Sequence, residues 1–406
     1  MARPNISFRI NDESMVVPIT EGFSTTIGAV YNPTNNLRVL GNTAEKDAGY
    51  YLVPNISDWY SRLNDYITGL QGGVTFAAGN TFYSVGSCAA SYLNGTYTAT
   101  GGISAGFSGE WWAVNNFLQY GSACYVGFGN GLAGITAFFN VGFDVMFQGV
   151  SSANAVSAIT SIIDYKASTD QPAIGVVYVP SATTTISSSS SFTTPSGTST
   201  KEYTRVYGEK VHLDTTGLYS VTTMLTPDIA GCIVRTDRDY YPWFSPAGSK
   251  RGRILGVVRL ARALAPTEQD ILYDNGVNPV VTFGGEGTLL YGDKTGESAS
   301  STLSRINVSR LFMYIKKALA PVARSILFEQ NDAITRSRFK IAAEGFLDRI
   351  VGQRGITEYK VICDSSNNTP EVIEANYFVA DVLIKPVTSI NYVRITLTNK
   401  DLSSVL

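Results

Sequence analysis

The sequence predicts a mixed α/β protein with two domains, one built around a βαβ unit and one with two long helices and a sheet. The βαβ unit consists of a helical run at 153–167 between buried strand-like runs at 143–147 and 173–179. Two longer runs with helical periodicity follow at 307–329 and 333–353. We therefore expect parallel strands joined by a right-handed crossover, followed by a unit dominated by helices.

Shorter elements are expected on either side of these runs. A strand-like segment occurs at 6–10, and an amphipathic helix is expected at 57–70 with Ser57 as its N-cap. Further helices are expected at 254–264 and from Thr267, where acidic residues fill the first turn and suit the helix dipole.

The C-terminal region carries two strand patterns. Apolar and polar side chains alternate from 377 to 385, and Pro386 ends this pattern because it has no N–H to donate to a sheet. Alternation returns from 390 to 398. The apolar face of this second pattern comprises Val393, Ile395 and Leu397. An unpaired strand with one apolar face favours pairing with another chain, so we expect this end of the chain to serve association.

The composition is typical of a subunit of a larger assembly. Charged residues make up 16% of the 406 residues and hydrophobic residues 44%, which suggests extensive interfaces as well as cores. Residues 1–230 hold 9 Lys/Arg against 15 Asp/Glu, and residues 231–406 hold 22 against 18. This imbalance is too weak for nucleic-acid binding, but the basic second half suits docking on an acidic protein surface.

We expect neither membrane insertion nor secretion. Residues 111–143 contain no charged side chain, but glycines and amide side chains interrupt the run, so it does not resemble a transmembrane helix. The first residues lack the apolar core of a signal peptide, which favours a protein made and kept in a cytoplasm. The cysteines at 88, 124, 232 and 363 lie too far apart for a CxxC metal or disulfide framework.

An enzymatic alternative depends on one motif. Residues 102–106 match GxSxG, which in hydrolases presents a nucleophile, here Ser104, on a sharp turn beside an acid and a histidine. The single histidine, His212, is more simply a polar residue in a strand than a catalytic base. A serine hydrolase with nucleophile Ser104 is therefore the less favoured alternative.

No cofactor or metal site is predicted. The glycine runs at 127–131 and 284–287 lack GxGxxG spacing, and the GDKTG segment at 292–296 lacks the Walker order of a phosphate-binding loop. The charged side chains of RTDRD at 235–239 are expected to form a salt-bridge network rather than a metal pair. His212 lacks the further ligands that a metal ion needs.

Several dispersed segments are similar to one known family. The segments are AGCIVRTDRDYYPWFSPAG at 230–248, NGVNPVVTFGGEGTLLYGDKT at 275–295, INVSRLFMYIKKAL at 306–319, FEQND at 328–332, and Cys363-Asp364 with the following NNTPEVIEAN and IKPVTSI. Together they cover 230–390 and resemble the contractile tail sheath proteins of bacteriophages. The N-terminal half matches loosely, and the PGVY-type opening common in the family is missing.

This resemblance implies a structural subunit rather than an enzyme. Such subunits stack as hexameric rings around a tail tube and shorten to drive the tube through the bacterial envelope. The implied partners are further copies of the chain, the tail tube protein, and baseplate and tail terminator proteins, in a virion tail assembled in the host bacterial cytoplasm. The sheath of a pyocin-like particle or another contractile injection system is an open alternative, because these systems share the sheath core.

The resemblance also implies a division of the chain into four segments. They are an N-terminal arm at 1–22 that joins the inner domain, an outer α/β domain at 23–249, an inner sheath domain at 250–386, and a C-terminal arm at 387–406 that is donated to a neighbouring subunit. Within the outer domain, residues 181–200 hold 15 Ser/Thr out of 20, so we expect an exposed loop there.

Two groups of residues are candidate contact sites. Strand exchange between subunits is expected at Ile6, Phe8, Ile10, Tyr392, Val393, Ile395 and Leu397. Contact with acidic side chains on the tube is expected at Lys316, Lys317, Arg336, Arg338 and Lys340 on the two long helices. The simpler interpretation of the second group is a solvated helix face.

Overall fold

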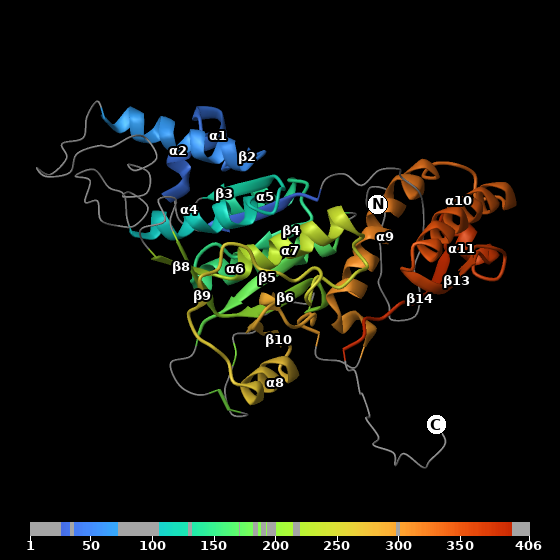
Figure 1. Ribbon diagram of the computed structural model, residues 1–406. Coiled ribbons are helices and arrows are strands. Elements are labelled where there is room, and N and C mark those ends of the chain that lie inside the picture. The colour runs from blue at the N-terminus through green and yellow to red at the C-terminus, as the bar shows by residue number, and fades with distance from the viewer. Residues whose placement is uncertain are drawn as a thin grey trace, which may run out of the picture.

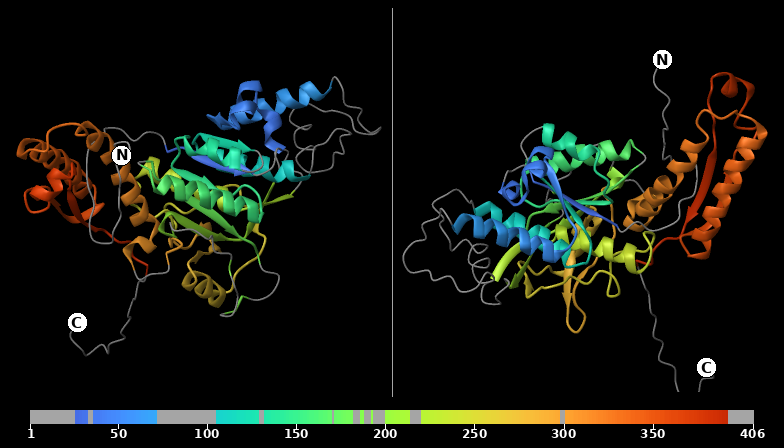
Figure 2. Two further views of the ribbon diagram at one scale, coloured as in Figure 1. Left: turned by 180° about the vertical axis from the view of Figure 1, so that it is seen from behind. Right: turned by 90° about the horizontal axis from the view of Figure 1, so that it is seen from above.

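An α/β body and a smaller C-terminal unit lie side by side, joined by the long helix α9 (Ile306–Ser325) (Figures 1 and 2). The computed structural model describes residues 26–32, 36–71, 105–128, 132–169, 171–181, 186–187, 192, 200–213, 220–297 and 301–391. Both parts are mixtures of helix and strand, so the expected mixed α/β class is confirmed.

A seven-stranded sheet forms the centre of the body. Its strands are β1 (Gly28–Asn32), β2 (Tyr50–Val53), β3 (Cys124–Phe128), β4 (Val145–Phe147), β5 (Ile174–Val179), β6 (Tyr203–Tyr207) and β10 (Val277–Asn278). They lie in the order β10-β6-β5-β4-β1-β3-β2, and every neighbouring pair is parallel except β2 with β3. Strands β1, β4, β5 and β6 are buried throughout, as expected for strands covered by helices on both faces.

Helices cover both faces of this sheet. α4 (Ala105–Leu118) and α7 (Thr226–Asp239) pack on one face, and α5 (Leu132–Phe139) and α6 (Ala153–Ala167) pack on the other. α6 joins β4 to the parallel strand β5, which confirms the predicted βαβ unit. α4 approaches β1 so closely that a Cβ on Gly28 would lie 2.1 Å from the Phe117 ring. Only glycine fits at this position without displacing α4.

The first helices in the described part of the chain form a layer beyond α4 (Figure 1). They are η1 (Asn36–Leu40), α1 (Thr43–Ala48) and α2 (Ile56–Gln71). The predicted amphipathic helix is present as α2, and its Trp59 is buried and stacks on Trp111 with 5.8 Å between ring centroids. Its N-cap is Asn55 rather than Ser57, because the Asn55 side chain accepts the Asp58 N–H at 2.9 Å.

Smaller elements surround the body. They are η2 (Thr200–Glu202), an antiparallel sheet of β7 (Glu209–Leu213), β8 (Ser220–Met224) and β9 (Arg259–Leu260), helix α8 (Pro266–Asp274), the hairpin β11 (Val280–Phe283) and β12 (Gly287–Leu290), and η3 (Thr302–Ser304).

The prediction of a helix at 254–264 is wrong. Gly256 adopts φ 62°, and the chain after it pairs as β9 with the edge of β7, so strand pairing replaces the helix. Thr267 is likewise not a cap: α8 begins at Pro266, and the Glu268 carboxylate accepts the Ala265 N–H at 3.1 Å.

The C-terminal unit contains α10 (Ala333–Gly352), α11 (Pro370–Glu374) and a two-stranded antiparallel sheet of β13 (Ile356–Ile362) and β14 (Asp381–Pro386). β14 ends at Pro386, as predicted, but begins later than residue 377. The reason is that the Asn368 side chain bonds both backbone groups of Val379, at 2.7 and 2.9 Å, in place of a strand partner.

Helix α9 contributes to two hydrophobic cores. Ile306 and Met313 belong to the core of the body, whereas Leu311, Ile315 and Leu319 pack with α10, β13 and β14. The apolar stripe of α9 is therefore wider than one interface requires, which is why the helix is buried from two sides. In the part of the chain that the structure describes, no helix combines the length and apolarity needed to cross a membrane. The uncharged run at 111–143 is divided among α4, β3 and α5.

Candidate assembly site

Polar side chains of α9 attach it to the amino-terminal ends of the parallel strands. Ser309 donates to the Lys201 carbonyl before β6 at 2.6 Å, and Arg310 donates to the Asp144 carbonyl before β4 at 3.2 Å. Lys316 donates to the Ala167 carbonyl at the end of α6 at 2.6 Å. These bonds fix the C-terminal unit relative to the sheet.

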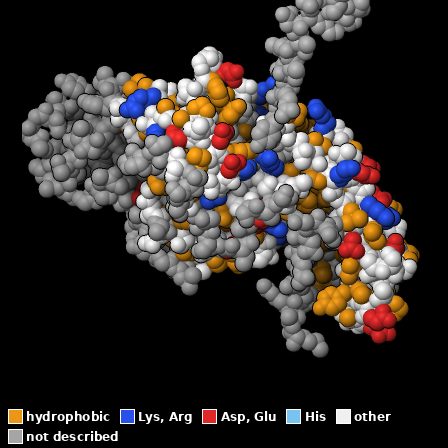
Figure 3. Space-filling model, turned by 90° about the horizontal axis from the view of Figure 1, so that it is seen from below, with side chains coloured by type: hydrophobic (Ala, Val, Ile, Leu, Met, Phe, Trp, Pro, Cys, Tyr) orange, Lys and Arg blue, Asp and Glu red, His pale blue; other side chains and the backbone are white. Residues whose placement is uncertain are grey.

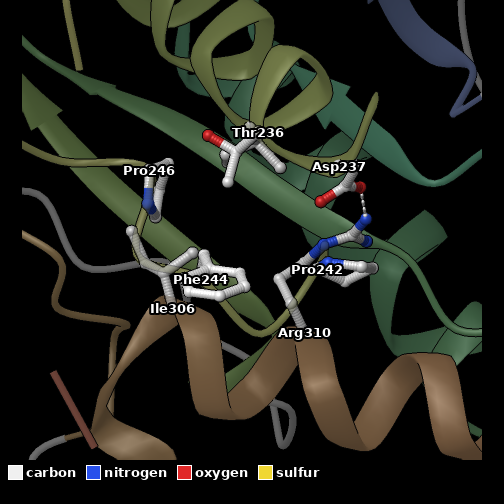
Figure 4. A pocket seen from close by; sticks show the side chains of 8 residues that line it. Thr236, Asp237, Pro242, Phe244, Pro246, Ile306 and Arg310 are labelled. Carbon is white, nitrogen blue, oxygen red and sulfur yellow. Dashed lines mark hydrogen bonds and ion pairs between the residues drawn. The ribbon is translucent and has the colours of Figure 1, made fainter. Parts of the chain in front are cut away.

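A buried ion pair lies at the centre of this junction. Arg310 on α9 pairs with Asp237 on α7, and their side chains are 7% and 3% exposed. The pair borders a small pocket between the two helices (Figure 4). Burial raises the pKa of Asp237, and the Arg310 charge opposes this rise. Thr26 also donates to the Asp237 carboxylate at 3.1 Å, so the start of the described chain is tied to the same group.

The pocket is a packing seam rather than a ligand site. Its lining consists of Ile233, Thr236, Asp237, Pro242, Phe244, Pro246, Ile306 and Arg310. Side chains fill it so far that it is too narrow for a water-sized molecule. Among the described residues, moreover, no group of three or more His, Cys, Asp or Glu side chains could hold a metal ion.

A second ion pair joins Lys317 on α9 to Asp144. Asp144 also accepts the Ile27 N–H at 3.1 Å, so its carboxylate connects α9 to the residue that precedes β1. Burial would raise the pKa of Asp144, but the charges of Lys317 and Arg310 outweigh burial and hold the pKa below its usual value. Asp144 is therefore an anion at neutral pH that holds α9 against the sheet.

The five basic residues predicted to face a tube lie in different environments. Lys316 is 1% exposed and Lys317 is ion-paired with Asp144, which corrects the expectation that both lie on an open face. Arg336 donates to Asn331, and Lys340 lies 3.9 Å from Glu344. The apolar stripe of α9 gave no sign that its polar side would also be covered. The fifth residue, Arg338, is exposed on α10.

The residues predicted for strand exchange lie outside the described residues. They are Ile6, Phe8, Ile10, Tyr392, Val393, Ile395 and Leu397. Most of the Ser/Thr-rich segment and Ser104, the nucleophile of the hydrolase alternative, lie outside them as well. His212 is on β7 with 4% exposure, its ring 4.8 Å from that of Trp112 and its Nδ1 2.9 Å from the Leu213 carbonyl oxygen. This packed position agrees with the interpretation of His212 as a strand residue.

Residues 389–391, the last that the structure describes, lie at a second polar cluster, centred on Asp293. This carboxylate is 6% exposed and pairs with Arg305 at 2.8 Å. Ser389 donates to it at 2.6 Å and Asn391 at 3.2 Å. Ser245 and Tyr273 donate to it as well, at 3.2 and 3.3 Å. We call this set the Asp293 cluster. It ties Ser389 and Asn391 to four other parts of the chain, at residues 245, 273, 293 and 305.

The GDKTG segment at 292–296, which lacks the order of a phosphate-binding loop, makes contacts inside the fold. Its Asp293 accepts hydrogen bonds from Ser389 and Asn391. The Lys294 ammonium donates to the Tyr273 carbonyl at 2.7 Å and lies 4.1 Å from the centre of the Tyr273 ring. Thr295 donates to the Leu303 carbonyl at 3.0 Å. The residues of this motif therefore serve internal structure. No signal within the chain marked Asp293 as a hub, because its partners are spread from residue 245 to residue 391.

The fold and these clusters define an α/β protein of two units that buried ion pairs hold together. Comparison with known proteins gives the family. The family model for the phage tail sheath protein central domain matches residues 126–296, and that for the phage tail sheath C-terminal domain matches residues 298–399. The chain belongs to the phage tail sheath family. The predicted family and the predicted structural, non-enzymatic nature are thereby confirmed.

Individual relatives agree with this assignment. The tail sheath protein of Vibrio phage KVP40 is 45% identical over 186 residues, which are 45% of this chain and 28% of that protein. The tail sheath protein of Enterobacteria phage T4 is 46% identical over 169 residues, 42% of this chain and 26% of that protein. The matched region thus spans little more than a quarter of these phage proteins.

Solved structures share the fold over nearly the whole chain. A chain in the anti-feeding prophage baseplate is 15% identical with a TM-score of 0.66, and the match covers 99% of this chain and 100% of that one. A chain in the contracted PVC sheath complex, an extracellular contractile injection system, is 14% identical with a TM-score of 0.67, and the match covers 98% of each. At such low identity the likeness concerns the fold alone.

Proposed function

We propose that this chain is a subunit of a contractile tail sheath. In this proposal the subunits stack as hexameric rings in a helical array around a tail tube, and the array shortens to drive the tube through the bacterial envelope. The observation that carries the proposal is the apolar alternation of 390–398 in the sequence, which begins at Ile390, a residue that is 84% exposed beside the anchored Ser389.

Strand addition between copies is the proposed link. In the described part of the chain, β13 and β14 pair only with each other, so each leaves one edge of backbone donors and acceptors open. A strand from a neighbour would satisfy these groups with main-chain hydrogen bonds. We assign this role to Tyr392, Val393, Ile395 and Leu397 at one end, and to Ile6, Phe8 and Ile10 at the other.

The junction at α9 supports a rigid subunit whose ends are linkers. The ion pairs of Arg310 and Lys317 hold the body and the C-terminal unit together, so shortening would change contacts between subunits rather than the shape of each one. The energy would come from an extended lattice that relaxes to a contracted lattice with more favourable contacts, a switch between two packings of the same parts. No nucleotide is needed for such a step.

The proposed partners follow from this arrangement. They are other copies of the chain, a tail tube protein inside the array, and baseplate and tail terminator proteins at its ends, in a virion tail assembled in the host cytoplasm. A second candidate is the sheath of a non-phage contractile injection system. This candidate is favoured by the fold match to a chain of an extracellular contractile injection system, which covers 98% of this chain.

Electron microscopy tests the proposal directly. Purified full chain, concentrated and negatively stained, is expected to form hollow cylinders built of stacked rings. Particles that remain monomeric at every concentration and salt tested would contradict it. The Lys46→Glu variant is a control that should leave the cylinders intact, because α1 lies on the opposite side of the body from the C-terminal unit (Figures 1 and 2).

We also propose that Arg336, Arg338 and Lys340 on α10 contact acidic side chains of the tube, whereas Lys316 and Lys317 act within the subunit. Changing the three α10 residues to Glu should release the tube from the sheath while the sheath still assembles. Co-sedimentation of sheath and tube measures this. Tube retention equal to that of the unmodified chain would refute the assignment, and Lys46→Glu again serves as the control.

A further inference from the structure

On α9 the cations Arg310, Lys316 and Lys317 bond within the subunit, and the C-terminal unit beyond α9 is not basic. Residues 326–391, which form the C-terminal unit beyond α9, hold seven Lys/Arg and nine Asp/Glu, a net charge of −2. Residues 240–267, which run from the end of α7 to α8, hold five Lys/Arg and no Asp/Glu. The molecule therefore carries a basic segment on its body and a slightly acidic C-terminal unit.

The basic segment is open to solvent over part of its length. Lys250, Arg253 and Arg259 are exposed, and Val258 between the last two is 60% exposed. Within the described part of the chain, none of these three cations forms an ion pair with a carboxylate. We call Lys250, Arg253, Val258 and Arg259 the basic strip. It combines unpaired positive charge with an exposed apolar side chain, as protein-binding surfaces do.

The far end of the C-terminal unit presents exposed apolar and acidic side chains. Phe328 is 89% exposed, and Ile334 and Tyr377 are 61% and 67% exposed. The Asn331 side chain donates to the Tyr377 carbonyl at 2.8 Å, which places the turn between α9 and α10 beside the end of α11. Glu329 and Glu374, next to these residues, are exposed.

We call Phe328, Glu329, Ile334, Glu374 and Tyr377 the acidic tip. Apolar and acidic side chains gather at this end of the molecule in Figure 3. Neither carboxylate forms an ion pair with another described residue.

The backbone at the tip is strained. Phe328 adopts φ 71°, a left-handed conformation that is rare and unfavourable for a bulky side chain. Such strain is retained where surrounding structure enforces it, and here it holds an aromatic ring out in solvent. Phe328 is 89% exposed, so its side chain is hardly buried within its own subunit. This points to a partner that covers the ring.

We propose that the acidic tip of one copy docks on the basic strip of a second copy. The proposal rests on the sheath function proposed above, because a helical polymer needs contacts between two different surfaces of the same chain. The two surfaces are complementary in both respects: carboxylates face unpaired cations, and the Phe328 ring faces the apolar side chain of Val258. A tube or a baseplate protein is not required to explain either surface.

Charge reversal tests the contact. The strip variant carries Lys250→Glu and Arg259→Glu, and the tip variant carries Glu329→Lys and Glu374→Lys. Each of these two variants alone places like charges opposite each other. The concentration needed for polymerisation, measured by sedimentation velocity, should therefore rise about tenfold or more. The variant with all four changes keeps the net charge of the unmodified chain and should polymerise. An equal mixture of strip and tip variants should also polymerise, because their surfaces are again complementary.

The outcomes separate the contact from the function. The contact would be overturned if the strip variant and the tip variant each polymerised at the same concentration as the unmodified chain. It would also be overturned if neither the four-residue variant nor the mixture regained polymerisation. An unmodified chain that never polymerises would instead overturn the proposed function and the contact with it. Salt gives a second measurement on the unmodified chain: raising NaCl from about 50 to about 500 mM should weaken polymerisation, and strengthening by salt would also overturn the contact.

Discussion

Ser389 donates a hydrogen bond of 2.6 Å to Asp293, a residue 96 positions earlier in the chain. The same carboxylate pairs with Arg305, the residue directly before α9. One buried anion thus fixes both the start of the helix that joins the two units and residues 389–391, the last residues that the structure describes.

Replacing Asp293→Asn should destabilise the fold by about 2–3 kcal/mol, because Arg305 loses its charge partner and the donors around it lose a strong acceptor. Ser389→Ala removes one donor and should cost only about 1 kcal/mol. Urea unfolding followed by fluorescence measures both. Equal unfolding midpoints for Asp293→Asn and the unmodified chain would show that the cluster does not stabilise the fold.

The buried pair of Arg310 and Asp237 should behave as a coupled unit. Arg310→Met or Asp237→Asn alone leaves a buried polar group without its partner and should cost about 3–5 kcal/mol. The double variant should recover part of this loss, since neither charge is then left unpaired. A double-mutant cycle by chemical denaturation gives the coupling energy, and strict additivity of the two losses would contradict direct pairing.

The pair of Lys317 and Asp144 should make stability depend on pH. The pKa of Asp144 is lowered in the folded state, so its contribution is present above the unfolded pKa of about 4 and is lost as pH falls through the folded pKa. Lys317→Met should therefore reduce the free energy of unfolding by about 1 kcal/mol at pH 7. The difference between the two proteins should shrink below about pH 4. A difference that stays constant from pH 7 to pH 3 would exclude this ionic contribution.

Two glycines provide a matched pair of packing tests. Gly28→Ala would bring a Cβ within 2.1 Å of the Phe117 ring and should destabilise the fold by about 1–3 kcal/mol. Gly109, inside the same helix α4 as Phe117, has no atom within 4 Å of the added Cβ, so Gly109→Ala should stabilise the fold by up to about 1 kcal/mol. Thermal unfolding compares them, and equal shifts for both variants would contradict the close approach of α4 to β1.

Local patterns in the sequence predict the regular elements well. The helix predicted at 153–167 matches α6 residue for residue, and the strand before Pro386 is present because alternation and a terminal proline both have local causes. The segment at 254–264 could not be predicted in the same way. Its apolar and basic residues suit a helix, but pairing with β7, which precedes it by more than forty residues, decides the outcome.

The candidate site was harder to predict than the fold. Lys316 and Lys317 stand in the sequence like any exposed basic residues of an amphipathic helix, and only the sheet ends beneath α9 turn them into internal contacts. Asp237 was expected to pair within its own RTDRD segment, yet its partner is Arg310 on another helix. Ion pairs between distant segments leave no local pattern, so they require the structure.

The central claim is that the chain beyond Asn391 links one copy to the next. Sedimentation velocity of the full chain beside a variant that ends at Asn391 tests it most directly. We predict that the full chain forms large polymers while the shortened variant stays monomeric, with an unchanged unfolding midpoint because the Asp293 cluster remains complete. Polymers of equal size from the shortened variant would contradict the claim.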